Sequence, residues 1–213
     1  MALETMTDVS LREIKKARSK IALYEATLSL MGDKMLHEVM LEDICKKAEV
    51  SRVTFFKFFP QKDDVLIYFM RIWLTERKIE IEQQQMQGFK AIRHILHKVA
   101  EQAEKSPGVM TSLISFLAQM KMHPTMPELS EAEIQLLFPD HVNLSRRAPS
   151  LYDIFYLSMT EANQSGALKA EVPIDHAVKA LFTIFYGAFL TAQQFESEEI
   201  AMFYDIHLQL LES

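Results

Sequence analysis

The side chains best suited to binding a polyanion gather in one stretch, Asp43 to Lys62, which reads DICKKAEVSRVTFFKFFPQK. Arg52, Thr54 and Lys57 supply hydrogen-bond donors and positive charge on the outward side of a predicted short helix. Donors of this kind bind phosphate oxygens and the edges of bases in the DNA major groove. The stretch is typical of a helix-turn-helix that reads DNA.

Two short helices separated by a tight turn would position these donors. The apolar spacing predicts the first helix over residues 39–48 and the turn at residues 49–50. Ser51 is a suitable N-cap for the second helix, because its hydroxyl can accept a backbone N–H. Phe55 and Phe59 are four residues apart, so we expect both to face the core and to hold the second helix in place.

The predicted DNA-binding residues lie in the second helix and shortly after it: Ser51, Arg52, Val53, Thr54, Phe56, Lys57 and Lys62. We expect Arg52 and Thr54, in the first turn, to set sequence preference. Lys62 precedes the next long helix and can reach the phosphate backbone, so it would support binding to every sequence equally.

A third helix, Leu11 to Met31, is predicted before these two, ending at Gly32. Its apolar positions step by three and four residues: Ile14, Ala17, Ile21, Tyr24, Leu28 and Met31. Its other face carries the cations Lys15, Lys16, Arg18 and Lys20. These are either a solvated face or phosphate contacts, and the neighbouring helix-turn-helix favours the second reading.

Charge is segregated along the chain. The net charge is -6, but residues 10–62 hold 11 Lys or Arg against 7 Asp or Glu, so the remainder carries about -10. A basic end can bind phosphates by releasing counterions, while an acidic body keeps the molecule off non-specific sites.

Composition predicts an all-α protein without disulfides. Gly and Pro are scarce, 5 and 7 of 213 residues, and apolar residues recur at helical spacing almost everywhere. The only cysteine, Cys45, has no internal partner, and the N-terminus lacks the apolar run of a signal peptide, so we expect a cytoplasmic protein. No membrane span is expected, because the best apolar window, 177–192, is short and interrupted by Lys179.

Residues Ile21 to Leu66 resemble the N-terminal domain of the TetR family of bacterial transcriptional regulators. Three pieces carry the resemblance: EDIC at 42–45, AEVSRVTFFKFF at 48–59 and PQKDDVL at 60–66. The resemblance implies a three-helix DNA-binding domain, residues 1–62, followed by a larger helical domain, residues 63–213. Family members dimerise through the larger domain and usually bind a small effector there.

The sequence departs from the family pattern inside the helix-turn-helix. Glu49 stands where the turn usually has Gly, and a non-Gly residue at positive φ costs on the order of 1 kcal/mol. Its carboxylate would also face the phosphates unfavourably. Phe56 replaces the usual Tyr and could pack on a thymine methyl or a sugar, and Phe58 replaces a common His. The spacing from Gly32 to Ile44 is about three residues longer than usual.

Further helices are predicted over residues 63–85, 89–104, 108–121, 130–137, 150–165, 173–196 and 198–211. The last two are strongly apolar and could form the protomer core, a dimer interface or both. The resemblance implies that they pair with a second copy in a four-helix bundle. The predicted interface residues are Leu181, Phe185, Ala188, Phe189, Phe203, Tyr204 and His207. A two-fold dimer predicts a pseudo-palindromic operator.

The larger domain is rich in Met and aromatic residues, which suit either a plain core or an adaptable pocket. The resemblance favours a mostly apolar pocket for an apolar or amphipathic effector, polar only through Tyr hydroxyls and Gln119. The predicted pocket residues are Met110, Phe116, Met120, Tyr152, Phe155, Tyr156, Met159, Phe182 and Tyr186, and Met122 belongs to the same Met-rich stretch.

Catalytic and metal-binding patterns are weak in this chain. His94 and His97, three apart, could share a metal, but a site needs further ligands, and His123, His141 and His176 have no matching spacing. We find no nucleophile elbow, phosphate-binding Gly loop or HExxH motif, so we expect no metal, cofactor or enzymatic activity.

We therefore predict a homodimeric, ligand-responsive transcriptional regulator that acts as a repressor, in the sense that effector binding would release it from DNA. Two alternatives stay open. Glu49 and Phe56 motivate a helical interaction protein that has lost specific DNA binding, and His94 with His97 motivates an all-α enzyme.

Overall fold

The computed structural model describes residues 9–120, 125–195 and 199–213, and within these ranges it contains helices, turns and loops but no strand. The elements are α1 (Leu11–Met31), η1 (Leu36–Glu38), α2 (Leu41–Lys47), α3 (Arg52–Phe58), α4 (Asp64–Gln83), α5 (Gly88–Lys105), α6 (Pro107–Ala118), α7 (Glu131–Leu137), η2 (Pro139–His141), α8 (Val142–Arg146), α9 (Leu151–Gln164), α10 (Ile174–Gln194) and α11 (Ile200–Leu208). The all-α prediction is confirmed. None of these helices combines the length and apolar character needed to cross a membrane.

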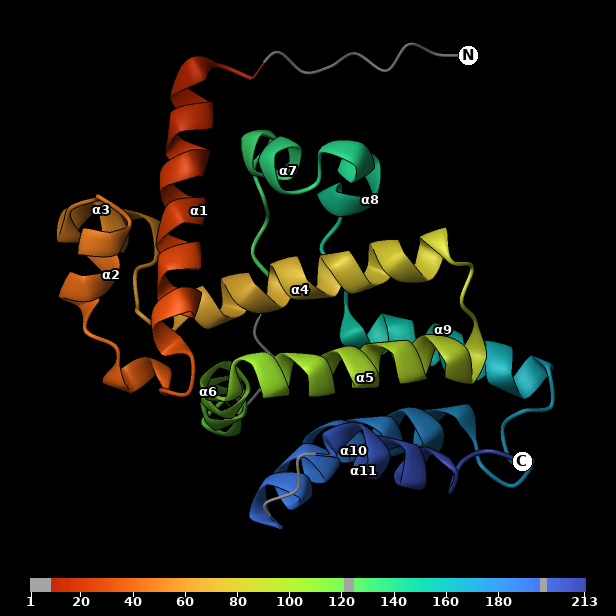
Figure 1. Ribbon diagram of the computed structural model, residues 1–213. Coiled ribbons are helices and arrows are strands. Elements are labelled where there is room, and N and C mark those ends of the chain that lie inside the picture. Colours follow the sequence, from red (N-terminus) through yellow and green to blue (C-terminus); the bar gives the residue numbers. More distant parts are fainter. Residues whose placement is uncertain (1–8, 121–124, 196–198) are drawn as a thin grey trace, which may run out of the picture.

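The helices form a long body with the first three helices across one end (Figure 1). Helix α1 stands upright there, and α2 and α3 lie on its outer side. Helices α4 and α5 run away from that end, while α10 and α11 cover the side of α5 opposite α4. The short helices α7 and α8 fill the angle between α1 and α4.

A first buried cluster holds the N-terminal helices together and continues beyond them. Tyr24 of α1 meets Tyr68 of α4 edge to face at 5.3 Å between ring centroids, and Phe59 packs on Tyr68 at 5.6 Å. The same cluster includes Val109 of α6 and Ile134 of α7. The predicted division at residue 62 therefore separates segments of the chain but not this core.

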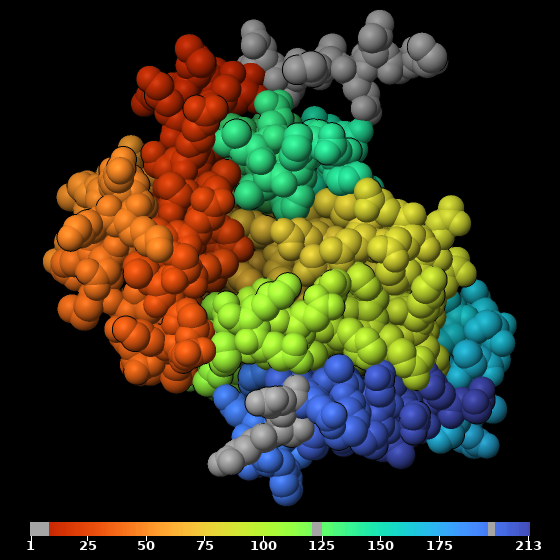
Figure 2. Space-filling view, viewed as in Figure 1, coloured from red at the N-terminus to blue at the C-terminus, as the bar shows by residue number. Residues whose placement is uncertain are grey.

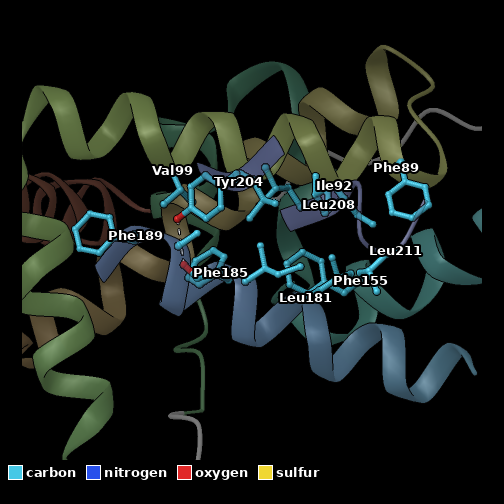
Figure 3. Packing of buried hydrophobic residues seen from close by; sticks show 14 of the residues in the cluster. Phe89, Ile92, Val99, Phe155, Leu181, Phe185, Phe189, Tyr204, Leu208 and Leu211 are labelled. Carbon is cyan, nitrogen blue, oxygen red and sulfur yellow. Dashed lines mark hydrogen bonds between the residues drawn. The ribbon is translucent and has the colours of Figure 1, made fainter. Parts of the chain in front are cut away.

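A second buried cluster lies among α5, α9, α10 and α11 (Figure 3). Ile92, Phe155 and Leu181 are fully buried there. The hydroxyl of Tyr204 donates to the carbonyl of Phe185 at 3.1 Å, which satisfies a polar group inside an otherwise apolar layer.

Local capping explains why several helices begin where the sequence predicts. The hydroxyls of Ser51, Ser130 and Ser150 accept backbone N–H groups at the starts of α3, α7 and α9. The 3-10 turn η1 was not predicted, and it occupies the longer spacing between Gly32 and Ile44. The five-residue helix α8 was also missed.

Helix α6 approaches the N-terminal helices closely through Gly108. The Gly108 amide donates to the carbonyl of Gly32 at 3.0 Å, and the Leu36 amide donates to the Ser112 hydroxyl at 2.8 Å. A Cβ at residue 108 would lie 2.0 Å from the carbonyl oxygen of Lys34, a distance that no relaxed contact allows. Glycine is required here because two backbones touch.

We expect Gly108→Ala to lower the free energy of unfolding by about 1–3 kcal/mol, since the methyl group must push α6 away from the loop after α1. Gly187→Ala is the matched control, because a Cβ there meets nothing within 4 Å and sits inside helix α10. The control should stabilise by up to about 1 kcal/mol. Denaturant unfolding measures both, and equal effects of the two changes would contradict the close approach at residue 108.

Candidate nucleic-acid interface and ligand cavity

Helix α3 is presented on the outer side of the molecule with one face anchored and the other free (Figure 1). The Ser51 hydroxyl accepts the Thr54 amide at 3.2 Å, as predicted for an N-cap. Phe55 and Phe59 are 0% and 2% exposed, whereas Val53 and Phe56 are 80% and 44% exposed. The anchoring residues are those predicted, and the free face can meet a partner.

The polar groups of α3 are held by weak, exposed interactions. Arg52 Nη1 lies 2.8 Å from Glu42 Oε1 of α2 in a pair whose side chains are more than half exposed. The Thr54 and Ser51 hydroxyls lie 3.0 Å apart, and Lys57 is exposed. An exposed ion pair is worth less than about 1 kcal/mol, so a phosphate or base can compete for Arg52.

Lys62 lies differently from the other predicted contacts. Its ammonium donates to the carbonyl of Val39 at 2.5 Å, and partial burial lowers the pKa of the amine. The side chain thus fastens the start of α4 to the chain between η1 and α2. Contact between Lys62 and DNA stays a prediction, and it requires a phosphate to replace or share this carbonyl.

The four cations predicted on the polar face of α1 differ in their surroundings. Lys15, Lys16 and Arg18 are exposed, so either reading of them stands. For Lys20 both predictions, a solvated side chain and a phosphate contact, are wrong. Its ammonium lies 2.7 Å from Glu133 Oε1 of α7, and both side chains are little exposed. It also lies over the Tyr68 ring, 4.3 Å from the centroid.

The turn between α2 and α3 has the strained geometry expected of it. Glu49 adopts φ +55°, the left-handed region in which a side chain is disfavoured, and the residue is exposed. Val50 N–H donates to the Cys45 carbonyl at 3.0 Å, so the turn closes regularly despite the missing glycine.

A cavity of about 370 Å³ lies in the larger domain beneath α4. Its walls are apolar and come from α4, α5, α6, α10 and the start of α9, together with the loops before α7 and after α8. The lining residues are Phe69, Met70, Trp73, Leu74, Val99, Met110, Leu113, Leu117, Thr125, Met126, Ala148, Pro149, Ser150, Leu151, Tyr152, Phe182, Phe185 and Tyr186. None of them carries a carboxylate, an imidazole or an amine, so the site suits binding of an apolar molecule.

The predicted pocket residues are divided by the structure. Met110, Tyr152, Phe182 and Tyr186 line the cavity. Phe155 and Met159 are fully buried in the core among α5, α9 and α10 instead, and Phe116, Met120 and Tyr156 do not line the cavity either. Gln119 is exposed, and Met122 and His123 lie outside the described residues.

The cavity residues that the sequence reading missed come mainly from α4: Phe69, Met70, Trp73 and Leu74. These residues recur at helical spacing, which predicts a buried face. Periodicity gives no sign that part of such a face borders empty space, since core and cavity walls have the same composition.

The residues predicted for a dimer interface need correction. Five of them pack inside the protomer, where Figure 3 shows several between α5 and the two last helices: Leu181, Phe185, Ala188, Phe189 and Tyr204. Phe203 and His207 are half-buried, and His207 Nδ1 lies 2.7 Å from the Phe203 carbonyl. The large apolar residues left exposed on α10 and α11 are Leu190, Met202 and Ile206, and Leu210 is exposed just after α11.

His94 and His97 face different carboxylates and do not form a shared site. His94 Nε2 lies 2.6 Å from Glu80 Oε2, and His97 Nε2 lies 3.0 Å from Asp205 Oδ2. Among the described residues no group of three His, Cys, Asp or Glu side chains could hold a metal. Both histidines serve as links between helices.

Comparison with protein families identifies the N-terminal segment. Residues 23–69 match the family described as bacterial regulatory proteins, tetR family, which covers α2, α3 and parts of α1 and α4. Comparison with curated proteins gives no match. The resemblance of this segment to the TetR family of bacterial transcriptional regulators is confirmed.

Solved structures of similar fold cover nearly the whole chain. Escherichia coli NemR in its reduced form is 15% identical with a TM-score of 0.59, covering 92% of this chain and 98% of its own. Thermus thermophilus FadR with lauroyl-CoA is 18% identical with a TM-score of 0.58, covering 90% and 92%. Bacillus subtilis FadR with stearoyl-CoA is 16% identical with a TM-score of 0.58, covering 91% and 97%. At these identities the likeness establishes the fold alone.

We expect Glu49→Gly to raise the free energy of unfolding by about 0.5–1 kcal/mol, because glycine adopts the positive φ without strain. Gln85→Gly is the matched control, since Gln85 has φ +49° at the far end of α4. Both changes should stabilise in denaturant unfolding. Only Glu49→Gly should also tighten DNA binding, by removing a carboxylate beside α3, and a similar gain for the control would contradict that placement.

Proposed function

We propose that the protein is a ligand-responsive repressor that acts in the cytoplasm as a homodimer on a pseudo-palindromic operator. The observation that carries the proposal is the orientation of α3. Its Phe55 side is locked in the core, and its Val53 and Phe56 side is open to a partner. The match of residues 23–69 to a DNA-binding family model supports a duplex as that partner.

The free face of α3 suits a half-site rich in thymine. Val53 and Phe56 offer no hydrogen bond, so the base atoms that they could recognise in the major groove are the 5-methyl groups of thymine. Arg52 and Lys57 flank them and can bind guanine edges or phosphates. Val53 and Phe56 would thus set the preference for a base sequence, and Arg52 and Lys57 would add affinity for DNA.

Pairing of two copies through α10 and α11 would give two reading helices. The exposed apolar residues on these helices, among them Ile206 at 51% exposure, lie on the face turned away from the protomer core. A two-fold pairing of this face leaves one α3 on each copy for successive major grooves.

The cavity would bind the effector. Its lining is apolar apart from hydroxyl groups such as those of Ser150, Tyr152 and Tyr186, so an apolar or amphipathic small molecule fits best. The two FadR structures contain acyl-CoA molecules, which are amphipathic, and this agrees with the class without naming the effector here. An apolar lining of this kind suits the binding of a ligand rather than catalysis.

Release from DNA would follow from differential affinity. An effector that binds the non-operator conformation more tightly shifts the population toward it, by no more than that difference in affinity. The distance or tilt between the two α3 helices would then no longer match successive grooves.

The rival proposal is an interaction protein with the same scaffold. The carboxylate of Glu49 beside α3 and the apolar Phe56 motivate it, because neither strengthens contact with phosphate. Such a protein would bind all duplexes weakly and alike.

In vitro selection from random duplexes tests the proposal. We expect a pseudo-palindrome with thymines in both half-sites, bound with a steep loss of affinity between about 50 and 200 mM salt. Replacing a contacted thymine by deoxyuridine should weaken binding about fourfold for each buried methyl, and this loss should vanish in Phe56→Ala or Val53→Ala. Leu157→Ala, 60% exposed on α9, is the control.

Three outcomes separate the readings. No enriched sequence would support the interaction protein. An enriched site that is insensitive to deoxyuridine would keep the repressor but contradict the thymine contact. Equal losses in Phe56→Ala and Leu157→Ala would place the effect away from α3.

We expect Ile206→Asp to shift the protein from dimer to monomer in analytical ultracentrifugation, since a carboxylate would be buried against the partner copy. Leu157→Asp places the same charge on exposed α9 and should leave the dimer intact. A dimer that survives Ile206→Asp would contradict pairing through this face.

A further inference from the structure

A buried carboxylate joins the N-terminal helices to the larger domain. Glu133 of α7 is 5% exposed, and its Oε1 accepts hydrogen bonds from Lys20 Nζ of α1 at 2.7 Å and from the Tyr68 hydroxyl of α4 at 2.8 Å. Its Oε2 accepts from the amide and hydroxyl of Ser130. One side chain therefore links α7 to two helices, α1 and α4, that are far from it in the sequence.

The charges at this junction favour a fixed arrangement. Burial alone would raise the pKa of Glu133, but the hydrogen bond and charge of Lys20, with the bonds from Ser130, hold that pKa below its usual value. Arg71 is also fully buried on α4 and adds a second cation nearby. Separating Glu133 from Lys20 would leave charged groups without partners in a poorly solvated place.

The segment that carries Glu133 is linked within itself and to α4. Arg146 of α8 binds Glu131 of α7 through Nε at 2.9 Å, and Arg71 donates to the Ser145 carbonyl at 2.5 Å. Figure 2 shows this segment, in green, seated between α1 in red and α4 in yellow.

Both ends of the same segment line the cavity. Thr125 and Met126 precede α7, and Ala148 to Tyr152 follow α8, and all of them border the empty space. A molecule that fills the cavity would therefore contact both ends of the segment whose middle holds α1.

We infer that Glu133 is a positioning residue that couples the filling of the cavity to the orientation of α1, and thereby of α3, which packs on α1. This inference rests on the proposed function and names its route of regulation. With the cavity empty, Glu133 holds Lys20 and fixes α1 against α4. A bound molecule spreads the ends of the segment, draws α7 from α1 and frees the N-terminal helices to tilt.

A competing route runs through α6. That helix also lines the cavity, through Met110, and it touches the loop after α1 through Gly108. If α6 alone carried the signal, Glu133 would stabilise the fold without affecting the response. A double-mutant cycle separates these two cases, since coupled residues give non-additive effects.

The experiment fills the cavity by mutation, so that no effector is needed. Leu117→Trp adds a ring from the α6 wall, where Leu117 is half-buried beside the space. Leu157→Trp places the same ring on exposed α9 as the control. Hydrogen exchange of the α1 amides is measured in the unliganded protein for Leu117→Trp, Glu133→Gln and the double variant.

We expect Leu117→Trp to speed exchange in α1 about tenfold, Glu133→Gln to speed it similarly, and the double variant to show no further change. Lys20→Met breaks the same contact from the α1 side and should speed exchange in α1 to the same extent. It replaces Glu133→Gln in the comparison if that variant fails to fold. The control should match the wild type.

Additive effects of Leu117→Trp and Glu133→Gln, or no change in α1 exchange with Leu117→Trp, would overturn the inference. Because exchange is measured without DNA, this result is independent of the proposed repressor function. Measuring affinity for a selected duplex in the wild type, Leu117→Trp, Glu133→Gln and the double variant then tests whether the tilt reaches α3. A loss with Leu117→Trp that persists unchanged in the Glu133→Gln background would assign the signal to α6 and overturn the inference.

Discussion

The anchoring of α3 by two phenylalanines is the contact on which the rest of the structure depends. A seven-residue helix is too short to be stable in water, because forming its first turn costs more than so few hydrogen bonds return. Phe55 packs on Phe59, Phe59 packs on Tyr68 of α4, and both phenylalanines lie in the buried cluster that includes residues of α1 and α4, which supplies the missing stability. The outward face of α3 is free to meet a partner because buried residues on the inward face hold the helix in place.

That anchor also ties the presentation of α3 to the body of the molecule. Phe59 packs on Tyr68, and the Tyr68 hydroxyl donates to Glu133 of α7, so one tyrosine touches both the anchor and the buried ion pair. The core under α3 is continuous with the helices that border the cavity. A change in the larger domain therefore has a physical path to α3, and no flexible linker separates the two along this path.

Much of the fold was predictable because its determinants are local. The N-cap at Ser51 and the helix starts at Ser130 and Ser150 depend on neighbours within three residues, and the strain at Glu49 follows from a missing glycine. The partners of Lys20 and Lys62 were not predictable, because they lie 113 and 23 residues away and a lysine on a helix face looks the same whether solvated or paired.

The site was predicted less well than the fold. An apolar stripe such as that of α10 does not reveal whether its residues face the protomer core, a cavity or a second copy, and Leu181 and Phe182, neighbours in the chain, face the core and the cavity respectively.

The central claim is that the free face of α3 enters a DNA duplex. Photocrosslinking tests it most directly, with a photoreactive phenylalanine analogue placed at Phe56 in one protein and at Leu157 in another, each irradiated with the selected duplex. The account predicts a crosslink to DNA from position 56 and none from position 157. Equal crosslinking from both positions, or crosslinking to protein but not to DNA from position 56, would contradict it.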